Sequence, residues 1–359
     1  ALIISTDGIT NLWLNDLDDK KLNSLLNNTW FKAYSQAQNN RQGWLQTIEQ
    51  VTQQLWDCVM APVVNHLQQH NLQSATFIPT GYLSFLPLHA AWTEDSSSLT
   101  GRRYAFEEIQ FTYAPNALSL NAARTVAKQT PHNKLLAINE PLPVSANHLP
   151  SSSFETAKAV STFPGKGNFK ILQHESSTSA AVLDALPNYS TVHFSCHGSA
   201  NFQNPLDSGL LMANDEVLGL RDLLDLKLKG LRLAILSACE TGIPGTELPD
   251  EVISLPTGLL QAGAAGVISS LWSVSDLNTM LLLSRFYDLW RPQNPDTTSL
   301  DPPEALRQAQ FWLRDSTGPE LAPYLQTSHP ELVAKLEQAK DKRPFAHPFY
   351  WAAFTYTGV

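Results

Sequence analysis

Two histidines, a cysteine and a glycine lie close together in the segment TVHFSCHGSA, residues 191–200. A second cysteine, Cys239, follows the next long apolar run in the segment LRLAILSACETG, residues 231–242. Imidazole and thiol side chains in such a pattern serve in metal binding, in core packing, or in nucleophilic catalysis with histidine as the base. The spacing of these residues helps to distinguish among these three roles.

Metal binding fits the spacing poorly. On a regular strand His193 and His197 point to the same face, but four residues span about 13 Å at ~3.3 Å per residue, so the two cannot share one ion. Cys196 points to the opposite face from both. A zinc site needs four ligands at short pair spacings, and the sequence contains no CxxC pair. We therefore predict neither a metal nor a cofactor.

Thiol catalysis fits better. His197 and Gly198 leave one predicted strand, and Cys239 leaves the next in the series. In an open α/β sheet, ligands bind beyond the carboxyl ends of the strands. If the two strands are neighbours, imidazole and thiol face one crevice, and histidine can take the thiol proton. The backbone N–H groups of Gly198 and Cys239 can then donate to an oxyanion. A hydrogen-bonded structural histidine and an inert cysteine remain the alternative.

The elements that would position these residues alternate between short apolar runs and amphipathic patterns. This alternation predicts a mainly parallel sheet with helices on both faces. The expected strands are 135–138, 169–172, 192–195, 233–237, 266–270 and 352–356. The expected helices are 154–163, 179–186, 220–226, 249–262, 276–290 and 303–314, with a hairpin at 210–217.

A smaller α+β and helical region precedes this sheet. Two apolar runs around Asp7-Gly8 predict a hairpin, and large apolar residues three and four apart between 16 and 72 predict amphipathic helices. Further on we expect two strands joined by a turn at 74–92, a strand at 104–113 and a helix at 116–128. The predicted segments are a hairpin and helical region at 1–72, a β-rich part at 73–130 and a catalytic domain at 131–359.

The charge balance disfavours several classes of partner. The 359 residues carry a net charge of −9 and no extended run of lysine or arginine, so we expect no direct nucleic-acid partner. Three cysteines, Cys58, Cys196 and Cys239, do not make a disulfide framework and fit a reducing cytoplasm. No apolar run is long enough to cross a bilayer, so no membrane partner is expected either.

Five segments taken together resemble a known family. HFSCHGSA, NPLDSGLLMAN, LSACETG, AGAAGVISSLWSVSD and HPFYWAAFTYTG occur in order within residues 130–359 and are similar to CHAT domains, caspase-like proteases related to separase. FIPTGYLSFLPLHAAW is a weaker match that starts near residue 75. The resemblance implies a caspase-haemoglobinase-like sheet, hydrolysis of peptide bonds, His197 as general base and Cys239 as nucleophile.

The resemblance also implies partners. CHAT domains often follow TPR helices, so we expect the stretch 16–72 to be a remnant or linker of an upstream TPR-type region. That region or a regulatory protein would gate cleavage of a specific protein substrate. Family members act in bacterial regulated proteolysis, some of them in CRISPR-linked antiviral defence. A catalytically silent interaction module with the same fold is the alternative function.

Three further residues are candidates for substrate binding. WSVSD resembles the separase segment in which an acid binds arginine at the cleaved position, which implies that Asp276 recognises a basic substrate residue. The alternative is that Asp276 caps the following helix. Trp272 either forms a wall of the substrate pocket or packs against the sheet. Asp207 is either a second acid of the site or a turn former. No carboxylate is assigned to orient the histidine.

Overall fold

The computed structural model describes residues 1–199, 201, 204–228, 230–243, 253–294, 296–338 and 342–359. The chain divides into two compact units. Unit 1 comprises Ala1–Ala75 and Leu86–Phe111, and unit 2 comprises Thr76–Phe85 and Thr112–Val359. The boundaries of these units differ from those of the predicted segments 1–72, 73–130 and 131–359. The division into those three segments stays a prediction.

Unit 1 is a hairpin followed by helices and a small β-structure. Its elements are β1 (Leu2–Ser5), β2 (Gly8–Asn11), α1 (Asp19–Ser24), α2 (Phe31–Ser35), α3 (Arg41–Leu55), α4 (Ala61–Gln69), β4 (Trp92–Glu94), β5 (Arg102–Tyr104) and α5 (Ala105–Glu108). The predicted hairpin and helical stretch are confirmed. Two π-helical turns, Leu25–Trp30 and Trp56–Met60, join α1 to α2 and α3 to α4.

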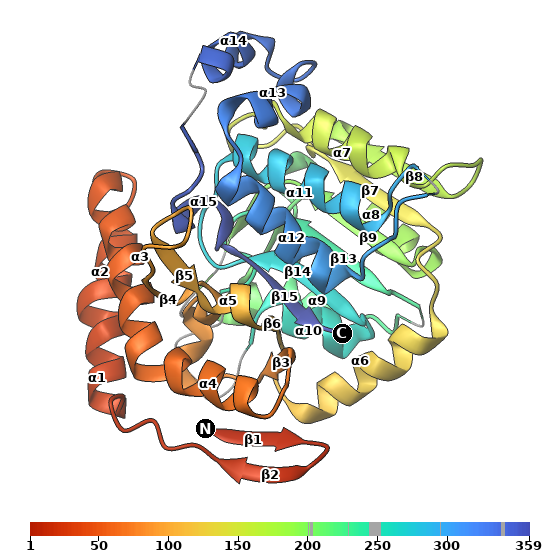
Figure 1. The fold of residues 1–359 in the computed structure, drawn as a ribbon. Coiled ribbons are helices and arrows are strands. Elements are labelled where there is room, and N and C mark those ends of the chain that lie inside the picture. Colours follow the sequence, from red (N-terminus) through yellow and green to blue (C-terminus); the bar gives the residue numbers. More distant parts are fainter. Residues whose placement is uncertain (200, 202–203, 229, 244–252, 295, 339–341) are drawn as a thin grey trace. The chain divides into compact units, whose positions relative to one another are not determined.

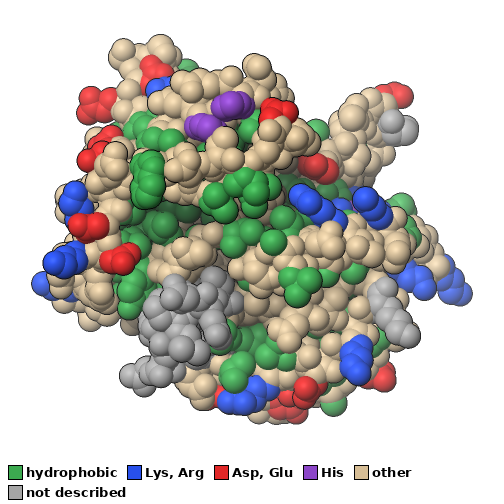
Figure 2. Space-filling view, turned by 90° about the horizontal axis from the view of Figure 1, so that it is seen from below, with side chains coloured by type: hydrophobic (Ala, Val, Ile, Leu, Met, Phe, Trp, Pro, Cys, Tyr) green, Lys and Arg blue, Asp and Glu red, His purple; other side chains and the backbone are tan. Residues whose placement is uncertain are grey.

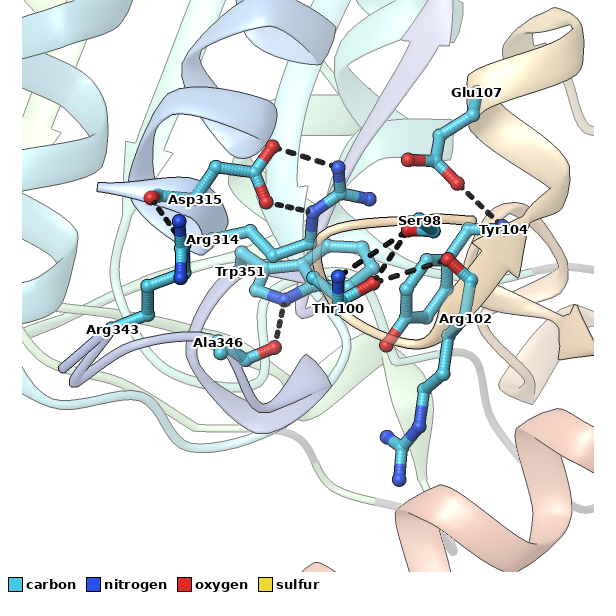
Figure 3. A network of polar contacts seen from close by, with 10 residues as sticks. All are labelled: Ser98, Thr100, Arg102, Tyr104, Glu107, Arg314, Asp315, Arg343, Ala346 and Trp351. Carbon is cyan, nitrogen blue, oxygen red and sulfur yellow. Dashed lines mark hydrogen bonds and ion pairs between the residues drawn. The ribbon is translucent and has the colours of Figure 1, made fainter. Parts of the chain in front are cut away.

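The strand predicted at 104–113 is wrong. β5 ends at Tyr104, one helical turn follows as α5, and the next strand, β6, covers only Gln110–Tyr113. The physical reason is a helix cap: the carboxylate of Glu107 accepts a hydrogen bond from the backbone N–H of Tyr104 at 2.6 Å (Figure 3). Such a side-chain acceptor at the first turn satisfies a backbone N–H group and favours helix over strand.

Unit 2 contains most of an eight-stranded sheet with the order β3-β6-β15-β14-β13-β9-β7-β8 among the described residues (Figure 1). The pairs β7–β8, β7–β9, β9–β13, β13–β14 and β6–β15 are parallel, and β14–β15 is antiparallel. The strands are β3 (Ser74–Phe77), β6, β7 (Leu135–Asn139), β8 (Phe169–Gln173), β9 (Thr191–Ser195), β13 (Leu233–Ser237), β14 (Gly266–Ser270) and β15 (Phe354–Gly358). The predicted α/β class with a mainly parallel sheet is confirmed.

Helices cover both faces of this sheet (Figure 1). On one face lie α7 (Ser152–Ser161), α11 (Asp276–Trp290) and α12 (Pro302–Asp315). On the other lie α6 (Ala117–Gln129), α8 (Ser179–Ala185), α9 (Leu220–Leu224) and α10 (Leu255–Ala262), which share one apolar core with alternate residues of the central strands. Alternate side chains of a strand point to opposite faces, so strands covered on both sides are apolar throughout.

A small antiparallel sheet lies beside the site: β10 (Gly198–Ser199), β11 (Gly209–Leu211) and β12 (Val217–Gly219). It confirms the hairpin predicted at 210–217, whose turn contains Asn214 and Asp215 with φ of 65° and 57°. The predicted start of the helix at 249–262 lies outside the described residues, which show helix from Leu255 onward.

Three helices near the carboxyl end were not predicted: α13 (Gly318–Leu325), α14 (Pro330–Gln338) and α15 (Pro348–Trp351). Before α13, the buried guanidinium of Arg314 donates to both carboxylate oxygens of Asp315 at 2.7 and 2.8 Å (Figure 3). Arg343 Nε donates to the backbone oxygen of Asp315 at 2.9 Å. The Arg343 bond holds the end of α12 to a segment nearly thirty residues downstream.

Candidate functional site

The register between β9 and β13 defines the centre of the site. The two strands are adjacent and parallel, with Ser195 opposite Ser237, and the backbone N–H of Cys196 continues the ladder to the Ser237 oxygen at 3.3 Å. His197 and Cys239 each lie two residues beyond that last pair. The prediction that these strands are neighbours is therefore confirmed, and both residues leave the same edge of the sheet.

The orientation of His197 follows from one hydrogen bond. Its Nε2 lies 2.6 Å from the backbone oxygen of Asn147, in the loop between β7 and α7. A carbonyl oxygen only accepts hydrogen bonds, so Nε2 carries the hydrogen and Nδ1 is the basic nitrogen of the neutral ring. The backbone oxygen of His197 accepts from the N–H of Leu211 at 2.8 Å, which holds the residue from its other side.

Gly198 brings two backbones into contact. A Cβ atom at this position would lie 2.8 Å from the backbone oxygen of Cys239 and 3.2 Å from the Cβ of Ala238. Because Leu211 already bonds the oxygen of His197, the pair Gly198–Leu210 is of the non-hydrogen-bonded kind, and the Gly198 N–H points away from β11. Only glycine permits this approach.

The turn that carries Cys239 is tied to the end of β14. The backbone oxygen of Ala238 accepts from the Ser270 hydroxyl at 2.8 Å and from the Thr241 hydroxyl at 3.3 Å. The N–H of Ser270 donates back to Thr241 Oγ1 at 3.2 Å. Glu240, directly after the cysteine, has φ of 61°, a left-handed conformation that costs a non-glycine residue about 1–3 kcal/mol. The surrounding bonds hold the chain in this sharp turn.

The thiol of Cys239 is partly exposed and meets the segment after β14. The Ser273 hydroxyl donates to Sγ at 3.4 Å, and the thiol donates to the backbone oxygen of Val274 at 3.7 Å. Ser273, Val274 and Asn147 were not identified from the sequence. Their contacts depend on which loops meet at the sheet edge, and no local pattern encodes that.

Cys196 and His193 belong to the core. Cys196 is buried in the apolar cluster, and burial, with a smaller contribution from Glu155, raises the pKa of its thiol well above the usual range. His193 is fully buried, with Nε2 2.8 Å from Glu155 Oε1 and Nδ1 3.0 Å from the hydroxyl of Tyr287. Both ring nitrogens of His193 are thus occupied, and its role is structural.

The three residues predicted to bind substrate lie in different surroundings. Asp276 is the first residue of α11 and not its N-cap, and its Oδ2 accepts from the N–H of Ser151 at 2.7 Å. Trp272 is fully buried and its Nε1 donates to the backbone oxygen of Phe349 at 3.1 Å, the placement that its packing alternative describes, and a role in a pocket wall stays a prediction. Asp207 is exposed, lies in a 3₁₀ turn and contacts Asn204 and Arg221, as its turn-forming alternative predicts.

No group of three or more His, Cys, Asp or Glu side chains suited to a metal ion occurs among the described residues. His66 and His70 are four apart on α4 with ring centroids 4.5 Å from each other, but that pair has no third ligand in the described part of the chain.

No described helix is long and apolar enough to span a membrane. Figure 2 shows one face on which acidic and basic side chains both occur, mostly toward its rim.

The difference between the buried Cys196 and the partly exposed Cys239 can be measured. A raised pKa leaves less thiolate at any given pH, and burial excludes reagent, so Cys196 should resist iodoacetamide in the folded protein. At pH 8 iodoacetamide should modify Cys239 in the folded protein while Cys196 remains unmodified. Peptide mass spectrometry with and without denaturant checks this. Equal modification of both thiols in the folded protein would contradict the arrangement described.

The fold is that of several solved structures. The Saccharomyces cerevisiae separase–securin complex matches with a TM-score of 0.52 at 11% identity, over 85% of this chain and 17% of that chain. The Arg-specific cysteine proteinase gingipain R matches with a TM-score of 0.50 at 11% identity, over 87% of this chain and 67% of that one. At such identities the likeness shows a common caspase-like fold. The chain spans less than a fifth of the matched separase chain.

No curated protein sequence matches this chain. A protein family does: residues 49–359, most of the chain, match the CHAT domain. This range contains the whole eight-stranded sheet, both strand ends of the site, and the segments in which the resemblance was first seen. The chain therefore belongs to the CHAT domain family.

Proposed function

We propose that this protein is a cysteine endopeptidase in which His197 and Cys239 form a catalytic dyad. The strongest support is the parallel register of β9 and β13. Because Ser195 pairs with Ser237, His197 and Cys239 each follow two positions later at the same edge of the sheet. The hydrogen bond from His197 Nε2 to Asn147 adds to it, because it leaves Nδ1 to accept a proton.

The proposed reaction uses these groups in sequence. His197 takes the proton of Cys239, and the thiolate attacks the carbonyl carbon of the scissile peptide. The backbone N–H groups of Gly198 and Cys239 donate to the resulting oxyanion. His197 returns the proton to the leaving amine, and a water molecule activated by the same imidazole hydrolyses the acyl-enzyme. Ser273 hydroxyl, which donates to Sγ, supports the thiolate form.

The dyad predicts a clear mutational pattern. Cys239→Ala and His197→Ala should each lower peptide cleavage by several orders of magnitude, because a nucleophile and its base act as a unit. Cys196→Ala should retain most of the activity, since that thiol is buried in the core. Steady-state cleavage of a protein or peptide substrate, with folding checked by circular dichroism, measures all three. Full activity in Cys239→Ala would sink the mechanism.

A catalytically silent module is the competing function, and a reactive probe separates the two. A peptide acyloxymethyl ketone should label Cys239 covalently, and Cys239→Ala should abolish the labelling. Neo-termini detected by proteomics in the native host, compared between the protein and Cys239→Ala, would then identify the substrate. Absence of both labelling and new termini would favour the silent module.

We also propose that the residue before the scissile bond is basic. Asp276 is partly exposed and lies two residues after Val274, whose backbone oxygen contacts the Cys239 thiol. One of its carboxylate oxygens binds Ser151, while the other has no hydrogen-bond partner among the described residues. A guanidinium paired with such a partly desolvated carboxylate makes charge-assisted bonds.

This specificity proposal can be tested on two substrates. Truncating one member of a buried, hydrogen-bonded charge pair costs about 2–5 kcal/mol, so Asp276→Ala should lower kcat/KM on an arginine substrate by roughly thirtyfold or more. A leucine substrate should be affected far less. If Asp276 serves only to hold Ser151, both substrates should lose activity equally. A peptide library that shows an apolar or acidic preference would also refute a basic one.

Finally, we propose that a partner or an upstream region gates the activity. Separase was crystallised with securin, and this chain matches less than a fifth of that separase chain, which leaves room for regulation from outside the fold. The isolated chain should then cleave peptides slowly, below the ~1 s⁻¹ at the low end of ordinary turnover. Fast turnover by the isolated chain that host lysate does not change would contradict gating.

A further inference from the structure

The loop between β7 and α7, residues 140–151, is held by three carboxylates, one at its own start and two from other segments of the chain. We propose that two of these acids, Glu140 and Asp215, are positioning residues: they fix the loop so that its Asn147 carbonyl orients His197. The inference rests on the proposed function, because it gives the histidine of the dyad its orienting group. Nothing in the loop itself need touch substrate.

The first anchor is Glu140, at the point where β7 ends. Its backbone N–H donates to the oxygen of Ser195 at 2.9 Å, which continues the sheet toward β9, and its φ is 40°. Its side chain is buried, and Oε1 accepts from the backbone N–H of Leu149 at 2.6 Å and contacts Nδ1 of His148. Glu140 therefore ties the start of the loop to its far side.

The second anchor is Asp215, in the turn between β11 and β12. Its Oδ1 accepts from the backbone N–H of Ser145 at 2.7 Å and from the Ser145 hydroxyl at 3.0 Å. The preceding residue, Asn214, donates its backbone N–H to the oxygen of Pro143 at 2.8 Å. The left-handed conformations of Asn214 and Asp215 present both groups to the loop. This same small sheet includes Gly198, directly after the histidine.

Asn147 lies midway between the two anchored amides, Ser145 and Leu149. A backbone carbonyl has no side-chain torsion that could adjust its direction, so the loop backbone alone decides where its oxygen points. Carboxylate-to-amide bonds are among the stronger hydrogen bonds in proteins. With both flanking amides held, the oxygen stays 2.6 Å from His197 Nε2, so Nε2 keeps the hydrogen and Nδ1 stays the basic nitrogen of the ring.

The consequence for the reaction is geometric. If the loop loosens, the imidazole can rotate away from the thiol, and small misplacements of a catalytic group can cost about a hundredfold in rate. Substrate binding would not change, because neither acid is proposed to touch substrate. The expected signature is a lower kcat at an unchanged KM, together with slower alkylation of Cys239, because the imidazole no longer lies where it can take the thiol proton.

The chain offers a matched control. Glu216 follows Asp215, is also exposed, and its Oε2 also accepts from a backbone N–H, that of Ser179 at 2.8 Å. That bond holds the start of α8 and not the loop. Glu216→Ala therefore removes the same chemistry one residue away from Asp215.

The experiment compares Asp215→Ala, Glu140→Ala, Glu140→Gln and Glu216→Ala with the parent and with His197→Ala. Two experiments are made: steady-state kinetics on one peptide give kcat and KM, and iodoacetamide gives the rate of Cys239 alkylation from pH 5 to 9. Asp215→Ala and Glu140→Ala should lower kcat roughly tenfold or more at unchanged KM and shift the alkylation profile toward that of His197→Ala. Glu140→Gln keeps an acceptor for Leu149 and should lose less, and Glu216→Ala should behave as the parent.

Several outcomes would overturn the inference. Parent-like kcat and alkylation in folded Asp215→Ala and Glu140→Ala would do so, as would a fall in kcat that leaves the alkylation profile unmoved. If Glu140→Ala does not fold, Asp215→Ala decides, since its side chain is exposed. A His197→Ala profile identical to the parent would refute the dyad itself, which separates that failure from a failure of the anchors alone.

Discussion

The parallel register of β9 and β13 is the constraint on which the site depends. With Ser195 opposite Ser237, the residues that leave the two strands remain in step, and the chain needs no long side chains to bring imidazole and thiol to one edge. A slip of β9 by one residue would exchange the faces of its side chains and place Cys196 or Gly198 where His197 now lies opposite Cys239. The buried contacts of His193 with Glu155 and Tyr287 oppose that slip.

Much of the sheet could be predicted, because a strand buried on both faces is apolar throughout and is bounded by turn residues. Strands such as 233–237 and 266–270 and the helix 276–290 agree with the structure to the residue. The prediction failed where side chains override local preference. The carboxylate of Glu107 turned an expected strand into α5. The contact of the buried Trp272 with α15 could not be predicted either, because the sequence did not indicate that helix.

Some residues of the candidate site could be predicted from the sequence and others could not. His197, Gly198 and Cys239 could be found because their chemistry is carried by residue type and by position after a strand. The group that meets the histidine could not, because it is the backbone of Asn147, fifty residues away, and every residue type offers the same carbonyl. Its location depends on which loops converge at the sheet edge, a property of topology and not of local pattern.

The two halves of the site are held by different kinds of bond, and this has a consequence for how easily each opens. The turn at Cys239 is tied by Ala238, Thr241 and Ser270 into the ends of two central strands, so its amides should exchange with solvent only when the core itself opens. The loop 140–151 is held chiefly by a few side-chain carboxylates at its edge. We therefore expect the amides of this loop to exchange with solvent at a lower free energy than those of the Cys239 turn, in local openings that leave the sheet intact.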